Sequence, residues 1–186
     1  MTTPGTYDKD EQPVKKAVAH QAWSAAARPV LLDVAKEYNG TITYKELGET
    51  LQEVTGIRTR TLLQNWVSAV LATVAAESKE HDEPVLTSLC VRADGTVSPG
   101  YGEAIANRYG HGEPEDPQWH AAEERLRCYT HFGAKLPEDG GHPELTEQVR
   151  TERRKAALKN PPKRNVCPTC NLTLPRSGIC DTCNDL

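Results

Sequence analysis

The stretch from Arg28 to Gly102 constrains the fold most, because it alone combines periodic apolar residues, helix caps and a hairpin signal. Pro29 suits the first turn of a helix, apolar residues then recur at helical spacing as far as Tyr38, and Asn39-Gly40 supplies a left-handed stop. The pattern predicts a helix between Pro29 and Tyr38, the first of a central domain.

Two further helices are predicted after this stop. Thr43 and Glu46 have the spacing of a capping box, in which each side chain satisfies a free backbone N–H at a helix start. A second helix should therefore run from Tyr44 to a stop at Gly56. After a polar turn, a third helix presents one broad apolar face. That face comprises Leu62, Leu63, Trp66, Val67, Val70, Leu71 and Val74.

A hairpin is predicted to complete the domain. The segment from Val85 to Arg92 is rich in β-branched and apolar residues and predicts a strand. Ala93-Asp94-Gly95 should turn the chain, and Thr96-Val97-Ser98 should return beside the strand. Three helices followed by a hairpin describe a winged helix. We therefore expect a mainly α (α+β) protein with a winged-helix domain over residues 14–106.

The N-terminal segments should differ in order. Residues 1–13 are polar and charged and should be disordered, because they bury too little apolar surface to offset the entropy of ordering. An alanine-rich helix is predicted from Val14 to Ala27, where Pro29 would end or kink it. We expect Trp23 on this helix to pack onto the central domain.

Residues 107–149 should form an irregular loop and a helical extension. The loop is rich in glycine, proline and acidic residues, and a helix is predicted to begin at Pro117. A last helix is predicted from Glu144 to Leu158, before the prolines at 161 and 162. The residues expected to be buried on the helix after Pro117 are Trp119, Ala122, Leu126, Tyr129 and Phe132.

Four cysteines form two Cys-x-x-Cys pairs separated by nine residues near the C-terminus. Two residues between cysteines let each pair grip one ion, and four thiolates complete the tetrahedral shell of a structural zinc. We predict one structural Zn²⁺ in a zinc ribbon over residues 165–186; a redox dithiol pair is the alternative. The predicted ligands are Cys167, Cys170, Cys180 and Cys183.

A basic arm over residues 150–164 precedes the ribbon. It has seven basic residues against the single acid Glu152, although the whole chain has a formal net charge of -4. Such an arm can neutralise phosphates, but a solvated helix and linker would carry the same charges. The arm residues predicted to contact nucleic acid are Arg153, Arg154, Lys155, Lys163 and Arg164.

The start of the third helix is a second candidate nucleic-acid surface. A winged helix enters a DNA groove at this point, where Asn and Gln can read adenine and Arg can read guanine. Any amphipathic helix also needs a polar face, so this pattern leaves both interpretations open. The candidates here are Arg58, Arg60, Gln64 and Asn65.

Composition sets the remaining bounds. An apolar fraction of 37% can fill one modest core, and no apolar run approaches the roughly 20 residues of a membrane span. The start of the chain also lacks the apolar core of a signal peptide. We therefore expect a cytoplasmic protein with no membrane partner.

Two segments resemble the DNA-binding domain of alkylguanine alkyltransferases and alkyltransferase-like proteins. They are residues 40–47 (GTITYKEL) and residues 91–102, with Arg92-Ala93-Asp94-Gly95 and Ser98-Pro99-Gly100-Tyr101-Gly102. The resemblance implies a winged helix that binds DNA. It lacks the family's Pro-Cys-His-Arg nucleophile motif, since Thr87 and Ser88 stand where the cysteine and histidine should lie, so it argues against alkyl transfer. The ribbon also resembles ribbons of actinobacterial and phage proteins.

These patterns favour a non-enzymatic DNA-binding or regulatory protein. One alternative is a nuclease or repair enzyme that uses the loop around His111, and another is an adaptor whose ribbon docks on a protein partner. A second metal site from His111, His120, Cys128 and His131 is conceivable, but a helical Cys-x-x-His is more often packing. Cys90 has no histidine neighbour and is better explained as a small strand hydrophobe.

Overall fold

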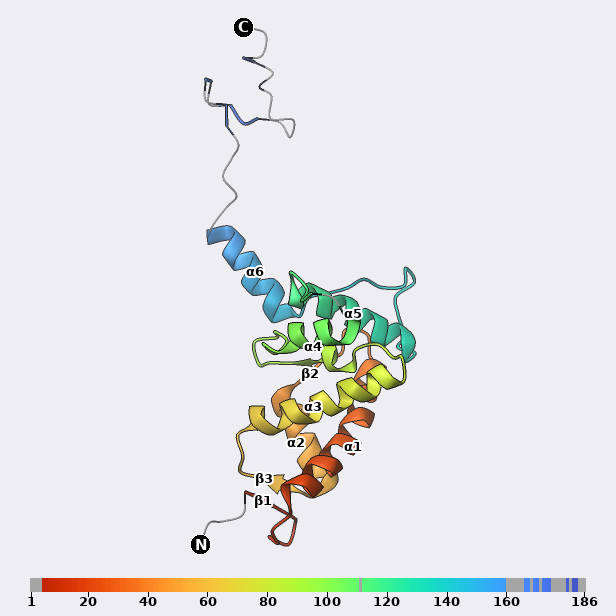
Figure 1. Cartoon of the computed structure of the whole chain (residues 1–186). Coiled ribbons are helices and arrows are strands. Elements are labelled where there is room, and N and C mark those ends of the chain that lie inside the picture. Colours follow the sequence, from red (N-terminus) through yellow and green to blue (C-terminus); the bar gives the residue numbers. More distant parts are fainter. Residues whose placement is uncertain are drawn as a thin grey trace. The chain divides into compact units, whose positions relative to one another are not determined.

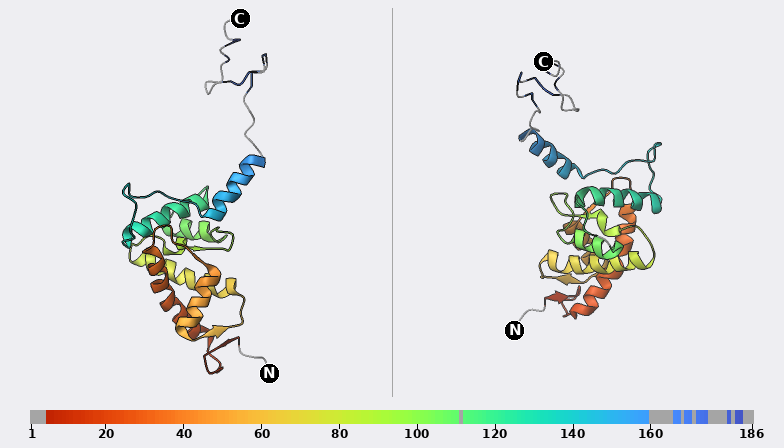
Figure 2. Two further views of the ribbon diagram at one scale, coloured as in Figure 1. Left: turned by 180° about the vertical axis from the view of Figure 1, so that it is seen from behind. Right: turned by 45° about the horizontal axis from the view of Figure 1, so that its top comes forward.

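The computed structural model describes residues 5–110, 112–159, 166–167, 169–170, 172–174, 180 and 182–183. The chain divides into two compact units, residues 1–150 and residues 151–186. The described part is mainly helical, as expected, with short two-residue strands (Figures 1 and 2). No helix in this part is long and apolar enough to cross a bilayer.

Three helices build the core of the first unit: α1 (Lys16–Ala35), α2 (Tyr44–Thr55) and α3 (Leu63–Glu80). Helix α1 packs against both α2 and α3, and α4 and α5 lie at one end of this group (Figures 1 and 2). The rings of Trp23 on α1 and Trp66 on α3 lie 4.3 Å apart between centroids. The indole N–H of Trp23 donates to the carbonyl of Ile57 at 3.1 Å, so the buried ring leaves no unpaired donor.

The prediction of two helices divided at Pro29 is wrong, because α1 is one helix from Lys16 to Ala35. A proline removes one N–H donor from a helix, yet here the helix continues through it. The reason is a buried stripe at every fourth residue that extends to both sides of Pro29, whose own ring is exposed. The stripe comprises Ala19, Trp23, Ala27, Leu31 and Ala35. Burial of this continuous face outweighs one missing hydrogen bond.

Helix α2 has the predicted ends. Thr43 and Glu46 form the capping box, and Gly56 ends the helix with a left-handed φ of 68°. Gly48 allows α2 to approach α3 closely, because a Cβ at that position would lie 2.4 Å from the Leu63 side chain. The predicted apolar face of α3 is also confirmed, except that Leu62 precedes the helix and is 67% exposed.

The predicted strand from Val85 to Arg92 is largely wrong. A 3-10 helix η1 occupies Leu86–Leu89, and only Cys90–Val91 forms a strand, β4. Leu86, Ser88 and Leu89 are all buried, whereas a half-buried strand would bury only alternate residues. The tighter 3-10 helix allows all three side chains to be buried. Strand β4 pairs in parallel with β2 (Ile42–Thr43).

The predicted return strand over residues 96–98 does not form either. The backbone N–H of Arg92 donates to the carbonyl of Thr96 at 2.7 Å, which closes a tight turn, and Gly95 has a φ of 77°. Val97 then turns inward, where it is buried with Val85 and Tyr101 in a small second cluster. Because Val97 packs into that cluster, residues 96–98 do not lie beside β4 as a second strand.

Helix α4 (Tyr101–Tyr109), which was not predicted, follows the turn and extends into the start of the loop expected from residue 107. Its Tyr101 and Ile105, one turn apart, are buried against Ala121 of α5. Gly110 ends the helix with a left-handed φ of 72°. Tertiary burial of two residues therefore stabilises a helix whose glycine and asparagine lower its intrinsic propensity.

Helix α5 (Pro117–His131) begins as predicted, with the Asp116 side chain accepting from two backbone N–H groups. Its buried face differs from the prediction, because Trp119 is 43% exposed whereas Glu124 and Arg125 are buried. Glu124 accepts from the N–H of Val85 at 3.1 Å and from Arg127 at 2.5 Å. The Oε1 atom of Glu124, which accepts from Arg127, also accepts from the Tyr109 hydroxyl at 3.1 Å.

Arg125 is the second buried charge of α5. It donates to the carbonyls of Ser88 at 3.3 Å and Glu144 at 3.0 Å, and burial lowers the pKa of its guanidinium. Glu124 thus binds the main chain just before η1, and Arg125 binds the main chain of Ser88 within it. The pattern of alternating charges in this helix gave no sign that these two face inward.

The expectation that residues 1–13 are disordered is wrong for residues 5–13, the part of this segment that the structure describes. Strand β1 (Thr6–Tyr7) pairs antiparallel with β3 (Arg58–Thr59), and Thr6 is buried. The Arg60 guanidinium lies 5.5 Å from the centre of the Tyr7 ring. Backbone pairing with β3 orders a segment whose own composition could not do so.

Helix α6 (Glu147–Lys159) crosses the division between the two units. In the first unit, Val149 is buried and the Thr146 hydroxyl donates to the carbonyl of Gly95 at 2.9 Å. In the second unit, residues 152–159 are exposed. Asn160-Pro161-Pro162, predicted to stop this helix, lies outside the described residues.

We predict that Trp66→Ala destabilises the first unit by about 3–5 kcal/mol, because it removes a buried ring packed on Trp23. The matched control is Trp119→Ala, which removes a 43% exposed ring and should cost at most about 0.5 kcal/mol. Urea unfolding followed by circular dichroism measures both. Equal losses in the two variants would contradict this assignment of the core.

Candidate metal centre and nucleic-acid interface

The four predicted metal ligands come together in the second unit. One sulfur atom from each of Cys167, Cys170, Cys180 and Cys183 lies within 4.8 Å of all the others. The sulfurs of Cys170 and Cys180 are 3.5 Å apart. All four cysteines are free thiols, so nothing in the covalent structure competes with a metal ion. This arrangement can hold a metal ion in a site closed by protein ligands.

Backbone hydrogen bonds position the first pair of cysteines. The N–H of Cys167 donates to the carbonyl of Leu172 at 2.8 Å, and Val166 pairs with Thr173 in an antiparallel bridge. The chain turns at Thr169 and Cys170, and the backbone N–H groups of these two residues donate to the Cys167 sulfur. These hydrogen bonds lower the pKa of the Cys167 thiol to about 6. A thiolate is the form that binds metal.

Two of the other cysteines, Cys170 and Cys183, retain their protons more strongly, because the pKa of each thiol is raised. Hydrogen bonding with Cys170, together with burial, raises the pKa of Cys183 to about 12. The cluster therefore combines one readily formed thiolate with thiols that share protons among themselves. A cation that binds the four sulfurs would replace these shared protons, which is why metal binding to such a site releases protons.

The predicted nucleic-acid residues of the first unit do not form one cluster. Arg58 and Arg60 are exposed at β3, where Arg60 stacks on Tyr7. Gln64 and Asn65 are exposed on the first turn of α3. Of these four, Gln64 alone lines a groove in the described structure, a hollow of about 450 Å³ between α2, α3 and the turn after β4.

Two cations missed by the sequence analysis flank this groove. Lys45 comes from the first turn of α2 and Arg92 follows β4. The parallel pairing of Thr43 with Val91 brings the residues that follow the two strands together, so both cations line one groove. Arg92 belongs to the Arg-Ala-Asp-Gly turn. The turn signal could therefore have predicted that Arg92 is exposed, but not that it lines a groove with Lys45.

The exposed lining of the groove is mostly apolar, with the polar side chains of Tyr44, Ser68 and Ser98 among it. The Tyr44 hydroxyl lies near Ser98 and Ser68, and burial raises the pKa of Tyr44. Lys45 lies 3.8 Å from Glu49 and Arg92 lies 3.9 Å from Asp94, both as exposed pairs. Exposed pairs of this length are weak, so both cations can exchange their partner for a phosphate.

The basic arm is only partly described. Arg153, Arg154 and Lys155 are exposed on α6, and Lys155 pairs with Glu152 at 2.7 Å. Helix α6 carries five basic residues against two acidic ones. Lys163 and Arg164 lie outside the described residues.

The remaining sequence candidates give no site. His111 lies outside the described residues, and His120 has its Nδ1 3.1 Å from the Tyr101 hydroxyl. Cys128 is fully buried, where burial raises its pKa to about 12. Within the described ranges, the C-terminal cysteines are the one group of metal-binding side chains close enough to share an ion.

Cys90 is a buried, protonated thiol. Its side chain is 2% exposed, and burial raises the pKa of the thiol far above its usual range. Thr87 and Ser88, which the alkyltransferase resemblance would align with that family's cysteine and histidine, lie in η1. A thiol held neutral and away from solvent is a poor nucleophile.

Fold and site together define a mainly helical protein with a four-cysteine centre. No family model, curated protein or solved structure matches this chain.

We predict that the protein binds one metal ion per chain and that Cys180→Ser abolishes this binding, because a hydroxyl is a poor substitute for a thiolate ligand. Elemental analysis of anaerobically purified protein measures the ion, and Thr182→Ser, beside the ligands, serves as the matched control. All three tryptophans lie in the first unit, so their fluorescence reports its unfolding alone. A shifted urea midpoint in Cys180→Ser would show that the two units depend on each other.

We also predict that iodoacetamide leaves Cys90 and Cys128 unmodified in the folded protein at pH 8, because both thiols are buried and protonated. Peptide mass mapping after labelling should find both modified only when urea is present. Equal labelling of Cys90 with and without urea would reveal an accessible thiol.

Proposed function

We propose that this protein is a non-enzymatic DNA-binding protein that carries a structural zinc ion. The observation that supports this most is the groove between α2, α3 and the turn after β4, with Lys45 and Arg92 in its lining. Two weakly paired cations in one groove suit a phosphate backbone that passes over it.

Helix α3 would supply the base contacts. Gln64 lines the groove and Asn65 is exposed on the same turn, so both amides are free to reach base edges. We propose the first unit as a reduced winged helix, in which the turn over 92–96 takes the place of a two-stranded wing. The resemblance to alkyltransferase DNA-binding domains supports this proposal, and the buried Cys90 favours binding without alkyl transfer.

Zinc is the metal that the cysteine centre suits best. Four thiolates within one small cluster are the usual ligand set of structural zinc, and they leave no open position for a reacting water. The thiols would need to lose their protons, so acidification should release the ion. In this proposal the ribbon orders the C-terminal segment, and the basic residues of α6 add phosphate contacts.

We predict that binding to duplex DNA weakens steeply with salt and that Lys45→Gln with Arg92→Gln reduces the slope. Each phosphate contact contributes about 0.9 to the slope of log affinity against log salt on duplex DNA, so the double variant should lose about 1.8. Fluorescence anisotropy with labelled duplexes at several salt concentrations measures this slope. Lys16→Gln with Lys36→Gln, two exposed lysines of the α1 region, is the matched control.

The α3 residues should act differently. Gln64→Ala should change the preference among duplex sequences and leave the salt slope as it was, because an uncharged side chain releases no counterions. No binding at about 50 mM salt, where phosphate contacts are strong, would contradict the DNA-binding function. The groove and the basic arm would then be assigned to a protein partner.

A further inference from the structure

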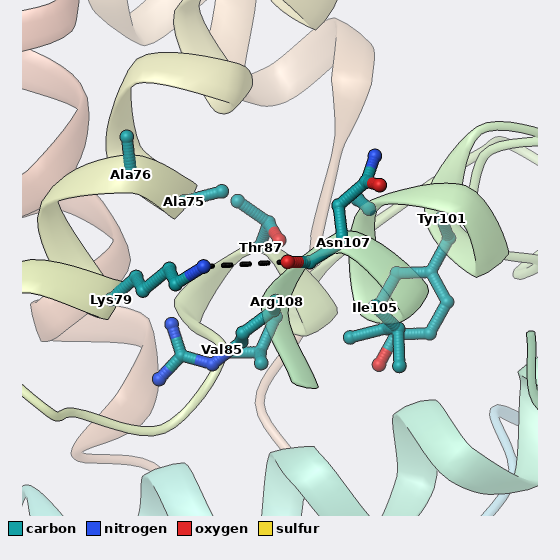
Figure 3. A pocket seen from close by; sticks show the side chains of 10 residues that line it. Ala75, Ala76, Lys79, Val85, Thr87, Tyr101, Ile105, Asn107 and Arg108 are labelled. Atoms are coloured by element: carbon teal, nitrogen blue, oxygen red, sulfur yellow. Dashed lines mark hydrogen bonds between the residues drawn. The ribbon is translucent and has the colours of Figure 1, made fainter. Parts of the chain in front are cut away.

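A second pocket lies on the first unit, between the C-terminal half of α3, η1 and α4. Its volume is about 170 Å³. Ala75 of α3 and Ile105 of α4 contribute apolar surface to it (Figure 3), as does Ala104 of α4. The pocket shares no lining residue with the proposed DNA groove.

Two cations, Lys79 and Arg108, stand on the same side of this pocket (Figure 3). The Lys79 ammonium donates to the backbone carbonyl of Asn107 at 3.3 Å. The Arg108 guanidinium donates to the backbone carbonyl of Glu83. Both acceptors are neutral, so these bonds hold the side chains in place without neutralising their charges.

Two acidic side chains that line the neighbouring cavity with Arg108 are paired with other cations. Glu83 pairs with Arg28 at 2.7 Å, and Glu124 pairs with Arg127 at 2.5 Å. Among the described residues, no carboxylate forms an ion pair with Lys79 or Arg108. Two like charges beside one apolar pocket repel each other unless an anion lies near them.

The size of the pocket limits what can enter it. An engineered apolar cavity of ~150 Å³ accepts benzene, so a pocket of about 170 Å³ can take one six-membered ring. Ala75 and Ala104 also line the next cavity along α3, so the pocket is not closed at that side. Small side chains at these two positions keep the apolar floor open.

We propose that this pocket binds a small organic anion, with a carboxylate or phosphate group between Lys79 and Arg108 and a compact apolar body on the alanine floor. Charge-assisted hydrogen bonds from an ammonium and a guanidinium fix the head of such a ligand. The apolar floor contributes burial of its body. This site is independent of DNA binding and of the metal centre.

The full-length, metal-loaded protein with ¹³C-labelled alanine methyl groups provides the test. Titration with benzoate should shift the methyl signals of Ala75 and Ala104, with a dissociation constant on the order of 1 mM. Benzamide has nearly the same shape without the charge and should bind at least about tenfold more weakly. Titration with phenyl phosphate shows whether the site prefers a carboxylate or a phosphate head.

Two variants locate the binding. Lys79→Gln should weaken benzoate binding about tenfold, whereas Lys16→Gln on α1 should leave it unchanged. Ala104→Leu fills the floor from an exposed position on α4 and should abolish the shift of the Ala75 methyl. Equal binding of benzamide and benzoate, unchanged affinity in Lys79→Gln, or no methyl shift with either anion would each overturn the proposal.

Discussion

The packing of α1 across α2 and α3 is the interaction on which the first unit depends. Its center is the contact of Trp23 with Trp66, 4.3 Å between ring centroids, with the Trp23 indole bonded to Ile57. The stripe at every fourth residue of α1 presents one face over the whole helix, so α2 and α3 share a single support. This face also explains why Pro29 fails to break the helix, since its ring lies on the exposed side.

A second constraint comes from the two buried charges of α5. A buried carboxylate or guanidinium is costly unless it is fully hydrogen-bonded, and here Glu124 binds the main chain just before η1 and Arg125 binds the main chain within it. They fix a stretch that has almost no regular backbone pairing of its own. The path from η1 through β4 to α4 sets both the groove with Arg92 and the pocket with Lys79, so two surface sites depend on α5.

The two candidate sites of the first unit are alike in construction. Each is a hollow beside α3 with two cations whose partners are weak or neutral, Lys45 and Arg92 at one and Lys79 and Arg108 at the other. In both, the cations come from different elements. The cysteine centre is built differently, because all four ligands belong to one short segment and a tight turn within each Cys-x-x-Cys pair brings its two sulfurs together.

The sequence by itself determined whatever depends on neighbours along the chain: the capping box at Thr43, the stop at Gly56, the face of α3 and the clustering of four cysteines. Periodicity, caps and short ligand spacings act within a few residues, so they can be recognised without a fold. Only the tertiary structure decided that α1 continues through Pro29, that η1 and α4 replace a hairpin and a loop, and that β1 pairs with β3. It also decided that Glu124 is buried and Trp119 exposed, and that Lys45 and Arg92 line one groove. In these cases burial and pairing between distant segments outweighed local propensity, because the free energy of packing a helix face exceeds that of a single residue's backbone preference.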